Sequence, residues 1–245
     1  MIDPLQRRAT REDLDALPRS VVGELIQGVL YTRTRPRPRH AGAASVLGGD
    51  LNGPYQRGRG GPGGWWILDE PGIELAALDV EEIVPDVAGW QRARLPTLPD
   101  GPITIAPDWV CEVLSPSSPW WKSRVPRTPS AAALARRETE GIPGVFRGRA
   151  TPSASSGAVL SVRGTSTTGC YTRAHDLKLK RPLYARAGVR WMWLVDVDAR
   201  TLNASRQHDG SWLEIGTWSD EDVARIEPFD AVEIHLAELW GAAAR

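Results

Sequence analysis

An internal segment that is too polar to join a hydrophobic core limits most strongly how this chain can fold. From about Pro119 to Ala174 the sequence is rich in Ser, Thr, Arg, Pro, Gly and Ala, and it carries nine basic residues against two acidic ones. Connections inside compact domains are usually short, and this composition favours disorder. We therefore predict that residues 119–174 are a disordered insert, and that residues 1–118 and 175–245 fold together as one domain.

Two roles are open for the insert at residues 119–174. Its positive charge would suit a basic arm that grips nucleic acid. The alternative is an inserted surface segment without a role of its own. We favour the second role, because no pattern of aromatic and basic residues of the kind that stacks on nucleic-acid bases recurs in the segment.

The remaining composition is that of a globular protein. The chain has 245 residues, 41% of them hydrophobic, which is enough for one domain or at most two. Its 30 basic and 30 acidic residues cancel, which argues against a histone-like coat for nucleic acid but leaves a local basic groove open. Cys111 and Cys170 have no zinc-site or disulfide spacing. Because the sequence shows no signal peptide and no apolar run long enough to span a bilayer, we expect a cytoplasmic protein without a membrane partner.

Apolar spacing and turn residues predict a mixture of strands and short helices. A capped helix is expected at residues 10–17, a hairpin turning at Gln27-Gly28, and a core-packing helix at residues 40–51. Further strands are expected at 65–75, 82–88, 103–114 and 190–196, then a hairpin at 202–218 and a closing helix at 236–244. Within the third of these strands, the period of two places Cys111 on the face opposite Glu112.

Two acidic residues lie among apolar neighbours on predicted strands. Asp86 follows Pro85, and Glu112 lies in the sequence WVCEVL. A buried charge is costly unless it is paired or binds a metal, and two carboxylates facing one cleft would form an oxygen site for Mg²⁺. The structural alternative is equally open: Asp86 starts a turn, and Glu112 pairs with an arginine on the sheet surface.

Several enzyme classes are poorly supported by the sequence. It contains no GxSxG nucleophile elbow, no phosphate-binding loop, no dinucleotide fingerprint and no HExxH zinc motif. Acyl hydrolases, nucleotide triphosphatases and zinc proteases are therefore not indicated, and we expect no organic cofactor.

Seven blocks of the sequence resemble, in the same order, blocks of the Uma family of restriction endonucleases, in the PD-(D/E)XK nuclease superfamily. They are ELIQGVLY, RPRPRH, GWWILDEP, IVPDVAGW, APDWVCEVLSPS, LYARAGVRWMWLVD and PFDAVEIHLAELW. The resemblance covers most of the chain except about residues 119–174. It implies an α/β (α+β) fold of the restriction-endonuclease type, with a mixed central sheet flanked by helices and the catalytic carboxylates on a β-hairpin.

The resemblance also implies a metal site. Pro85-Asp86 matches the PD of the family and Glu112 matches its second acid. These two carboxylates and the carbonyl of Val113 would bind Mg²⁺ or Mn²⁺. Leu114 stands where the superfamily pattern has its lysine, so the lysine must come from elsewhere.

In relatives that lysine has moved to the following helix, in the pattern Asp-x-x-x-Lys-Leu-x-x-Tyr. Asp176, Lys180 and Tyr184 have the matching spacing and would share one helical face. Lys180 is therefore the expected catalytic lysine, and we group Tyr184 with the nucleic-acid-binding residues. Pro182 lacks a backbone N–H, so it should resist a helix that already runs through Lys180 unless it lies in the first turn.

Four further residues match family positions or line a basic loop. Glu24 would add a catalytic carboxylate, although a solvated hairpin residue is an equal alternative. His40 would contact phosphate or transfer a proton, although a cap or packing role is common for a lone histidine at a helix start. Arg37 and Arg39 could line a phosphate path, or could simply be solvated.

The function that the sequence predicts is a metal-dependent endonuclease that hydrolyses DNA phosphodiester bonds. A homodimer would suit the cutting of both strands. The first alternative is a disabled nuclease-fold remnant or nucleic-acid-binding protein, in which Lys180 would lie far from the carboxylates of Asp86 and Glu112. The second alternative, a small-molecule hydrolase, would need a deep apolar pocket.

Overall fold

The computed structural model describes residues 7–34, 36–114, 167–168 and 173–241. The described residues on both sides of the internal segment belong to one compact unit. Most of the predicted insert at residues 119–174 lies outside the described residues, and so does Cys170. In the part of the chain that is described, no helix is long and apolar enough to cross a membrane.

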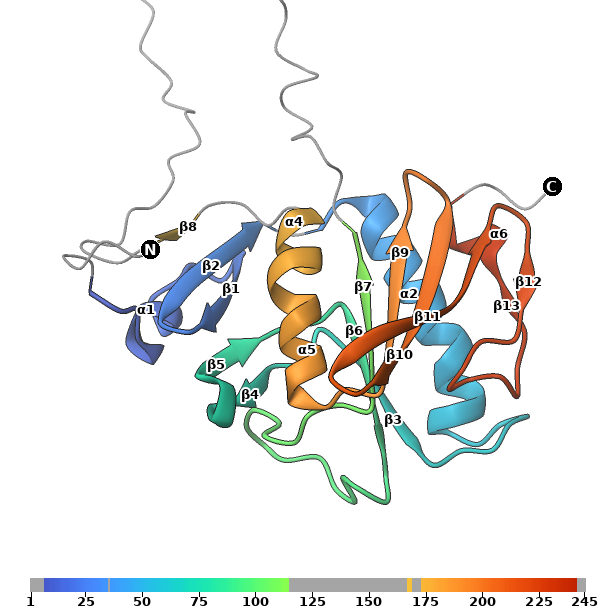
Figure 1. The fold of residues 1–245 in the computed structure, drawn as a ribbon, viewed down its shortest axis with the longest axis horizontal. Helices are drawn as coiled ribbons and strands as arrows, with labels where there is room; N and C mark the ends of the chain where they lie inside the picture. The colour runs from blue at the N-terminus through green and yellow to red at the C-terminus, as the bar shows by residue number, and fades with distance from the viewer. Residues whose placement is uncertain (1–6, 35, 115–166, 169–172, 242–245) are drawn as a thin grey trace, which may run out of the picture. The chain divides into compact units, whose positions relative to one another are not determined.

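The larger sheet has six strands in the order β11-β10-β9-β7-β6-β3 (Figure 1). The pair β7 and β9 is parallel, whereas every other neighbouring pair in this sheet is antiparallel. The sheet is therefore mixed, as predicted. Its strands are β3 (Trp65–Asp69), β6 (Val87–Gln91), β7 (Trp109–Val113), β9 (Trp191–Asp196), β10 (Thr201–His208) and β11 (Ser211–Ser219).

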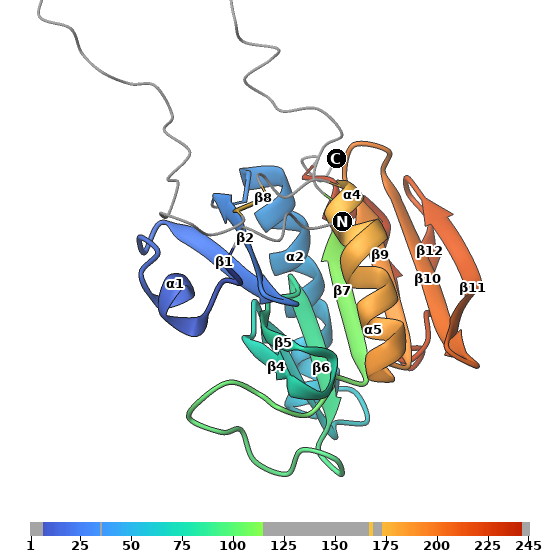
Figure 2. The ribbon, with the colours of Figure 1, turned by 60° about the vertical axis from the view of Figure 1, so that its left-hand side comes forward.

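Helices cover both faces of this sheet because its central strands are apolar on both sides. Figure 2 shows α2 (Pro38–Leu51) and α5 (Arg181–Ala187) on either side of β7. Cys111 packs in the core that α2 covers, whereas Val110 packs in the core that contains Leu183 of α5. The period of two then turns Glu112 toward α5, which confirms that Cys111 and Glu112 lie on opposite faces.

The smaller sheet has five strands in the order β4-β5-β1-β2-β8. The hairpin of β1 and β2 turns at Gln27 and Gly28, whose φ angles of 54° and 73° fit a two-residue hairpin turn. This confirms the predicted hairpin. Strand β8 comes from residues within the predicted insert and pairs in parallel with β2. The strands are β1 (Val21–Ile26), β2 (Val29–Thr34), β4 (Ile73–Leu75), β5 (Val80–Ile83) and β8 (Thr167–Thr168).

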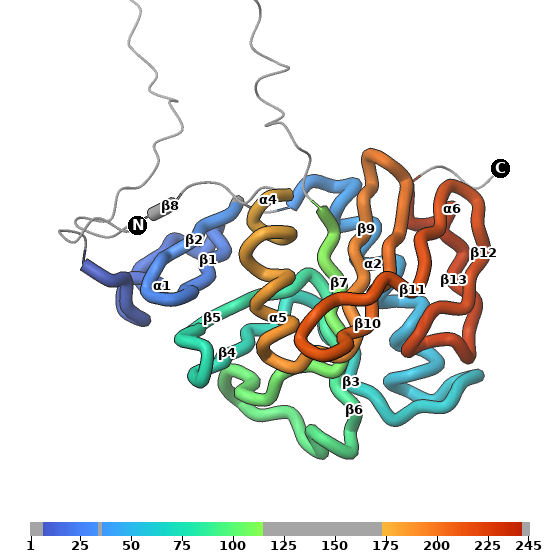
Figure 3. The backbone as a smooth tube through the Cα atoms, in the orientation of Figure 1, coloured from blue at the N-terminus to red at the C-terminus, as the bar shows by residue number. Residues whose placement is uncertain are grey.

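The remaining elements are short. They are α1 (Arg11–Asp15), the π-helical turn η1 (Asn52–Gln56), the 3-10 turn η2 (Ala76–Leu78), α4 (Arg173–His175), the π-helical turn η4 (Asp176–Lys180), the two-stranded sheet of β12 (Val223–Ala224) and β13 (Ile234–His235), and α6 (Leu236–Leu239). Figure 3 traces the segment from α4 through η4 to α5 as one continuous coil beside β7.

Several predicted elements have different bounds. The strand predicted at residues 65–75 is divided between β3 in the larger sheet and β4 in the smaller one, and α6 ends at Leu239. The strand predicted at residues 82–88 is two strands, because Pro85 lies where the chain passes from β5 in the smaller sheet to β6 in the larger one. Only Trp109–Val113 of the strand predicted at residues 103–114 is regular. The core-packing helix begins two residues early at Pro38, since proline suits the first turn of a helix.

The structure shows the exception predicted for Pro182, because the coil through Lys180 continues with the proline in the first turn of a helix. A wide π turn precedes the proline, in which the Arg181 N–H donates to the carbonyl of Asp176, five residues back. Pro182 then lies in the first turn of α5. The wider turn relieves the conflict between the proline and the regular helix register, so the coil continues from Asp176 through Tyr184.

Candidate active site

Five ionisable side chains from separate elements meet between the two sheets, on the side of β7 that α5 covers. They are Glu24 of β1, Asp86 before β6, Glu112 of β7, His175 of α4 and Lys180 of η4, and all five are buried. We call these residues the buried cluster. Buried charges are stable only when they are paired and hydrogen-bonded, so their contacts show how the cluster holds together.

Lys180 lies at the centre of the buried cluster and is 1% exposed. Its Nζ is 2.7 Å from Glu112 Oε1 and 3.1 Å from Glu24 Oε1, and it donates to the carbonyl of Val84 at 3.0 Å. Burial alone would lower the pKa of Lys180, but the charges of Glu112 and Glu24 outweigh it and raise the pKa well above its ordinary value. Lys180 is therefore a full cation at neutral pH.

Within the buried cluster, Glu112 is the carboxylate whose charged form is least favoured. Burial raises its pKa to about 7, and the negative charge of Asp86 adds to this, although Lys180 and the Tyr184 hydroxyl oppose it. That hydroxyl donates to Glu112 Oε1 at 2.7 Å, and Tyr184 is fully buried. Glu112 is thus held in place by a phenol and an ammonium group, and it titrates near neutral pH.

The pKa of Asp86 is shifted in the opposite direction to that of Glu112. Its Oδ2 accepts the Val113 N–H at 2.8 Å and lies 3.3 Å from His40 Nε2, while Arg33 donates to Oδ1 at 3.0 Å. Burial would raise the pKa of Asp86, but His40 and the charge of Arg33 outweigh it and lower the pKa. Asp86 is therefore an anion. The pairing of Val87 with Cys111, continued by one residue, sets Asp86 opposite Glu112.

Glu24 accepts hydrogen bonds on both carboxylate oxygens. Its Oε1 accepts the Val84 N–H at 2.8 Å, and its Oε2 lies 2.9 Å from His175 Nε2. Burial would raise the pKa of Glu24, but Lys180 and His175 outweigh it and lower the pKa. Glu24 therefore binds the N–H of Val84, and Lys180 binds its carbonyl. Val84 lies two residues before Asp86, so both side chains fix the backbone that leads to Asp86.

Asp176 lies beside the buried cluster and is 5% exposed. Burial and the negative charge of Glu112 raise its pKa well above the ordinary value. The neutral form of Asp176 is therefore favoured more than in an exposed aspartate, beside a site that already holds Glu24, Asp86 and Glu112.

The structure brings together the predicted Glu24, Asp86, Glu112 and Lys180, with His40 at the edge. Arg37 and Arg39 lie outside the cluster on the exposed N-terminal turn of α2, where Arg39 donates to the carbonyl of Val197 at 3.1 Å. Tyr184, which the sequence grouped with the nucleic-acid-binding residues, is buried and contacts the cluster through Glu112.

Two cluster contacts were not assigned from the sequence. His175 shows no ligand spacing, and its position became clear only when α4 was placed beside β1. The second contact is Arg33, which lies on β2 and pairs with Asp86. The signal that could have found Arg33 is the predicted hairpin, because its second strand continues to Thr34.

The donor set suits a hard cation that keeps part of its water shell. Within the described ranges, no group of three or more His, Cys, Asp and Glu side chains forms a ready metal cage. Asp86 and Glu112 are nevertheless close enough for the charge of one to raise the pKa of the other. Together with the carbonyl of Val113 they could supply oxygen ligands, and Mg²⁺ commonly binds through one or two carboxylates plus water.

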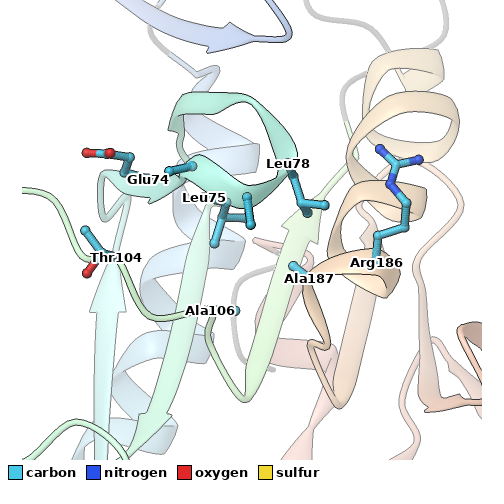
Figure 4. A pocket seen from close by; sticks show the side chains of 9 residues that line it. Glu74, Leu75, Leu78, Thr104, Ala106, Arg186 and Ala187 are labelled. Carbon is cyan, nitrogen blue, oxygen red and sulfur yellow. The ribbon is translucent and has the colours of Figure 1, made fainter.

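A separate hollow of about 320 Å³ lies between η2 and the end of α5. Figure 4 shows Leu75 and Leu78 on one side of it and Arg186 and Ala187 on the other. None of the residues that line this hollow belongs to the buried cluster. It therefore does not provide the deep apolar pocket over Asp86 and Glu112 that a small-molecule hydrolase would need.

Comparisons with known proteins show the fold and the family. A crystal structure described as that of a putative nuclease belonging to DUF820 from Anabaena variabilis has a similar fold, with a TM-score of 0.54 and 16% sequence identity. The match covers 94% of this chain and 96% of that one. No curated protein matches the chain. The model of the Uma2 family, described as "Putative restriction endonuclease", matches residues 11–119 and 166–237, and the chain therefore belongs to this family.

Proposed function

We propose that the protein is a metal-dependent endonuclease that hydrolyses DNA phosphodiester bonds. Membership of the Uma2 family supports a nuclease function in general. The observation that carries the finer proposal is the ion pair of Lys180 and Glu112 at 2.7 Å, beside the anionic Asp86 on the neighbouring strand. Two carboxylates could hold a metal ion, and one ammonium group could stabilise the charge on the phosphate.

We assign Asp86, Glu112 and the carbonyl of Val113 to a Mg²⁺ or Mn²⁺ ion. When bound, the ion would supply Lewis acidity and a water of lowered pKa. Asp86 is suited to this because the Val113 N–H fixes one of its oxygens. Glu112 is suited because burial and the negative charge of Asp86 raise its pKa, and a bound cation would favour its charged form.

Lys180 would place a fixed positive charge beside the reacting phosphate. Its contacts with Glu112, Glu24 and the Val84 carbonyl hold the ammonium group before substrate arrives, and such preorganised charge stabilises the transition state of phosphodiester hydrolysis. Tyr184 would orient Glu112 through its hydroxyl, which is a different role from the DNA contact that we first assigned to it.

DNA would approach at the N-terminal end of α2. His40 lies there next to Asp86, and Arg37 and Arg39 are exposed on the same turn. Exposed arginines at a helix N-terminus are suited to phosphate contacts, which position the duplex without reading its sequence. Two copies related by a twofold axis would let each cut one strand.

The alternative is a nuclease-fold remnant that binds nucleic acid without cutting it. The observation that favours it is the near-complete burial of Lys180, which is already paired with Glu112 and Glu24. In that case the cluster would stabilise the fold and would not react with substrate.

A plasmid-cleavage assay with Mg²⁺ or Mn²⁺ distinguishes the two functions. The parent, Asp86→Asn, a matched control Asp100→Asn on an exposed loop, and a version lacking residues 119–174 are compared. We expect cutting by the parent and by Asp100→Asn but not by Asp86→Asn. Equal cutting by the parent and Asp86→Asn would remove the assigned mechanism, and cutting only after deletion would mark the insert as inhibitory.

A further inference from the structure

We propose that His175 is a positioning residue that acts on Lys180 through Glu24, an inference that rests on the proposed nuclease function. His175 would not touch substrate or metal. Its contact with Glu24 would fix the carboxylate that, in turn, fixes the ammonium group of Lys180.

The contact between His175 and Glu24 is buried and well defined. His175 Nε2 lies 2.9 Å from Glu24 Oε2, and the two side chains are 7% and 0% exposed. The imidazole also packs edge-on against Tyr31, with ring centroids 4.7 Å apart at an angle of 61°. The imidazole ring is thus positioned by Tyr31 of β2 as well as by the carboxylate of Glu24.

The direction of the hydrogen bond follows from charge. Glu24 is an anion, because Lys180 and His175 outweigh the effect of burial on its pKa, and a carboxylate can only accept. His175 Nε2 must therefore carry the proton that it shares with Glu24 Oε2. A carboxylate partner of this kind fixes the orientation of an imidazole ring and is fixed by it in return.

The two carboxylate oxygens of Glu24 contact different groups. Oε2 accepts a hydrogen bond from His175, whereas Oε1 accepts the Val84 N–H at 2.8 Å and lies 3.1 Å from Lys180 Nζ. The terminal torsion of a glutamate is broad when nothing restrains it. With His175 on one oxygen and Val84 on the other, Glu24 can present Oε1 to Lys180 in only one orientation.

This arrangement gives Glu24 a narrower role than that of a metal ligand. Its oxygens already contact three protein groups, and it holds Lys180 in line with Glu112 Oε1. Loss of His175 would let the Glu24 carboxylate rotate and would loosen Lys180. The expected defect is therefore in the chemical step, with little change in substrate binding.

Four proteins test the inference in a cycle: the full-length parent, His175→Ala, Glu24→Gln and the double variant. We expect His175→Ala to lower kcat for plasmid cleavage by about 10- to 100-fold, the usual cost of losing such a supporting partner, with KM nearly unchanged. In the Glu24→Gln background the same substitution should have little further effect. The variant His175→Gln, whose amide can still donate to Glu24, should keep much of the kcat that His175→Ala loses.

The control is His208→Ala, which removes a histidine that is 74% exposed on β10 and should leave kcat unchanged. The inference is contradicted if His175→Ala leaves kcat unchanged. It is also contradicted if this substitution lowers kcat by the same factor in the parent and in the Glu24→Gln variant. Either result leaves the nuclease function intact. If the parent itself cuts nothing, the proposed function fails. The urea midpoints of the same four proteins then decide whether His175 and Glu24 are coupled, and additive shifts would refute the positioning role.

Discussion

Lys180 Nζ lies 2.7 Å from Glu112 Oε1, and the two side chains are 1% and 2% exposed. The pair joins η4 to the central strand β7, and Glu24 of the smaller sheet also contacts the same ammonium group. One cation therefore connects three elements that are distant in the sequence. Its removal should affect both the stability of the fold and the proposed chemistry.

We expect Lys180→Met to abolish DNA cleavage and to lower the free energy of unfolding by about 3–5 kcal/mol, because it leaves buried carboxylates without their cation. Urea unfolding and plasmid cleavage measure the two effects. The matched control is Lys178→Met on the same helical turn, where the side chain is exposed and the expected change in stability is within about 0.5 kcal/mol. Equal stability of the two variants would show that the buried ion pairs contribute little.

Metal binding should depend on pH through Glu112. Its pKa of about 7 means that the carboxyl is largely protonated at pH 6 and must lose its proton before it binds a cation. The affinity for Mg²⁺ should therefore rise by up to about tenfold per pH unit below pH 7, and level off above it. Isothermal titration calorimetry at pH 6, 7 and 8 measures this.

The control for the metal titration is Glu112→Gln, which keeps the size of the side chain but cannot titrate. It should bind Mg²⁺ weakly and with little dependence on pH in this range. A parent affinity that is the same at pH 6 and pH 8 would show that Glu112 does not bind the ion.

The thiol of Cys111 should be unreactive in the folded protein. Cys111 is fully buried in the core that α2 covers, and burial raises its pKa well above the ordinary value, so little thiolate is present. In a Cys170→Ser background, which leaves one thiol, a thiol reagent at pH 8 should react with Cys111 only after addition of urea. Rapid reaction of the native protein would show that the α2 side of the sheet opens readily.

The local pattern of the sequence predicted the elements that depend on neighbouring residues. The alternation around Glu112 placed this carboxylate opposite Cys111, and Gln27-Gly28 placed the hairpin turn, because strand period and turn conformation are local properties. Lys180 was predicted only through the family pattern. Nothing in its own segment indicates a buried lysine, since the carboxylates that stabilise it lie on β1 and β7.

The parts that were missed depend on long-range packing. His175 meets Glu24 only after the smaller sheet has packed beside α4, and neither segment carries a signal for this contact. Tyr184 was grouped with the nucleic-acid-binding residues, whereas its hydroxyl donates to the buried Glu112. The π turn before Pro182 was not predicted either, because the sequence pattern shows only the regular helix register.

Asp13 should make the stability of the fold depend on acidic pH. The guanidinium of Arg7 contacts both oxygens of Asp13 at 2.7 and 2.8 Å, and the Thr10 N–H donates to one of them, so the pKa of Asp13 falls from 3.8 to about 2. A depressed pKa stabilises the fold above the unfolded-state value and loses this contribution as pH falls from about 4 to 2. The urea midpoint of Asp13→Asn should therefore lie below that of the parent at pH 7 and approach it at pH 2.5. Asp15→Asn, an exposed neighbour in α1, should show almost no difference at either pH, and a constant gap for Asp13→Asn would mean that its charge is not involved.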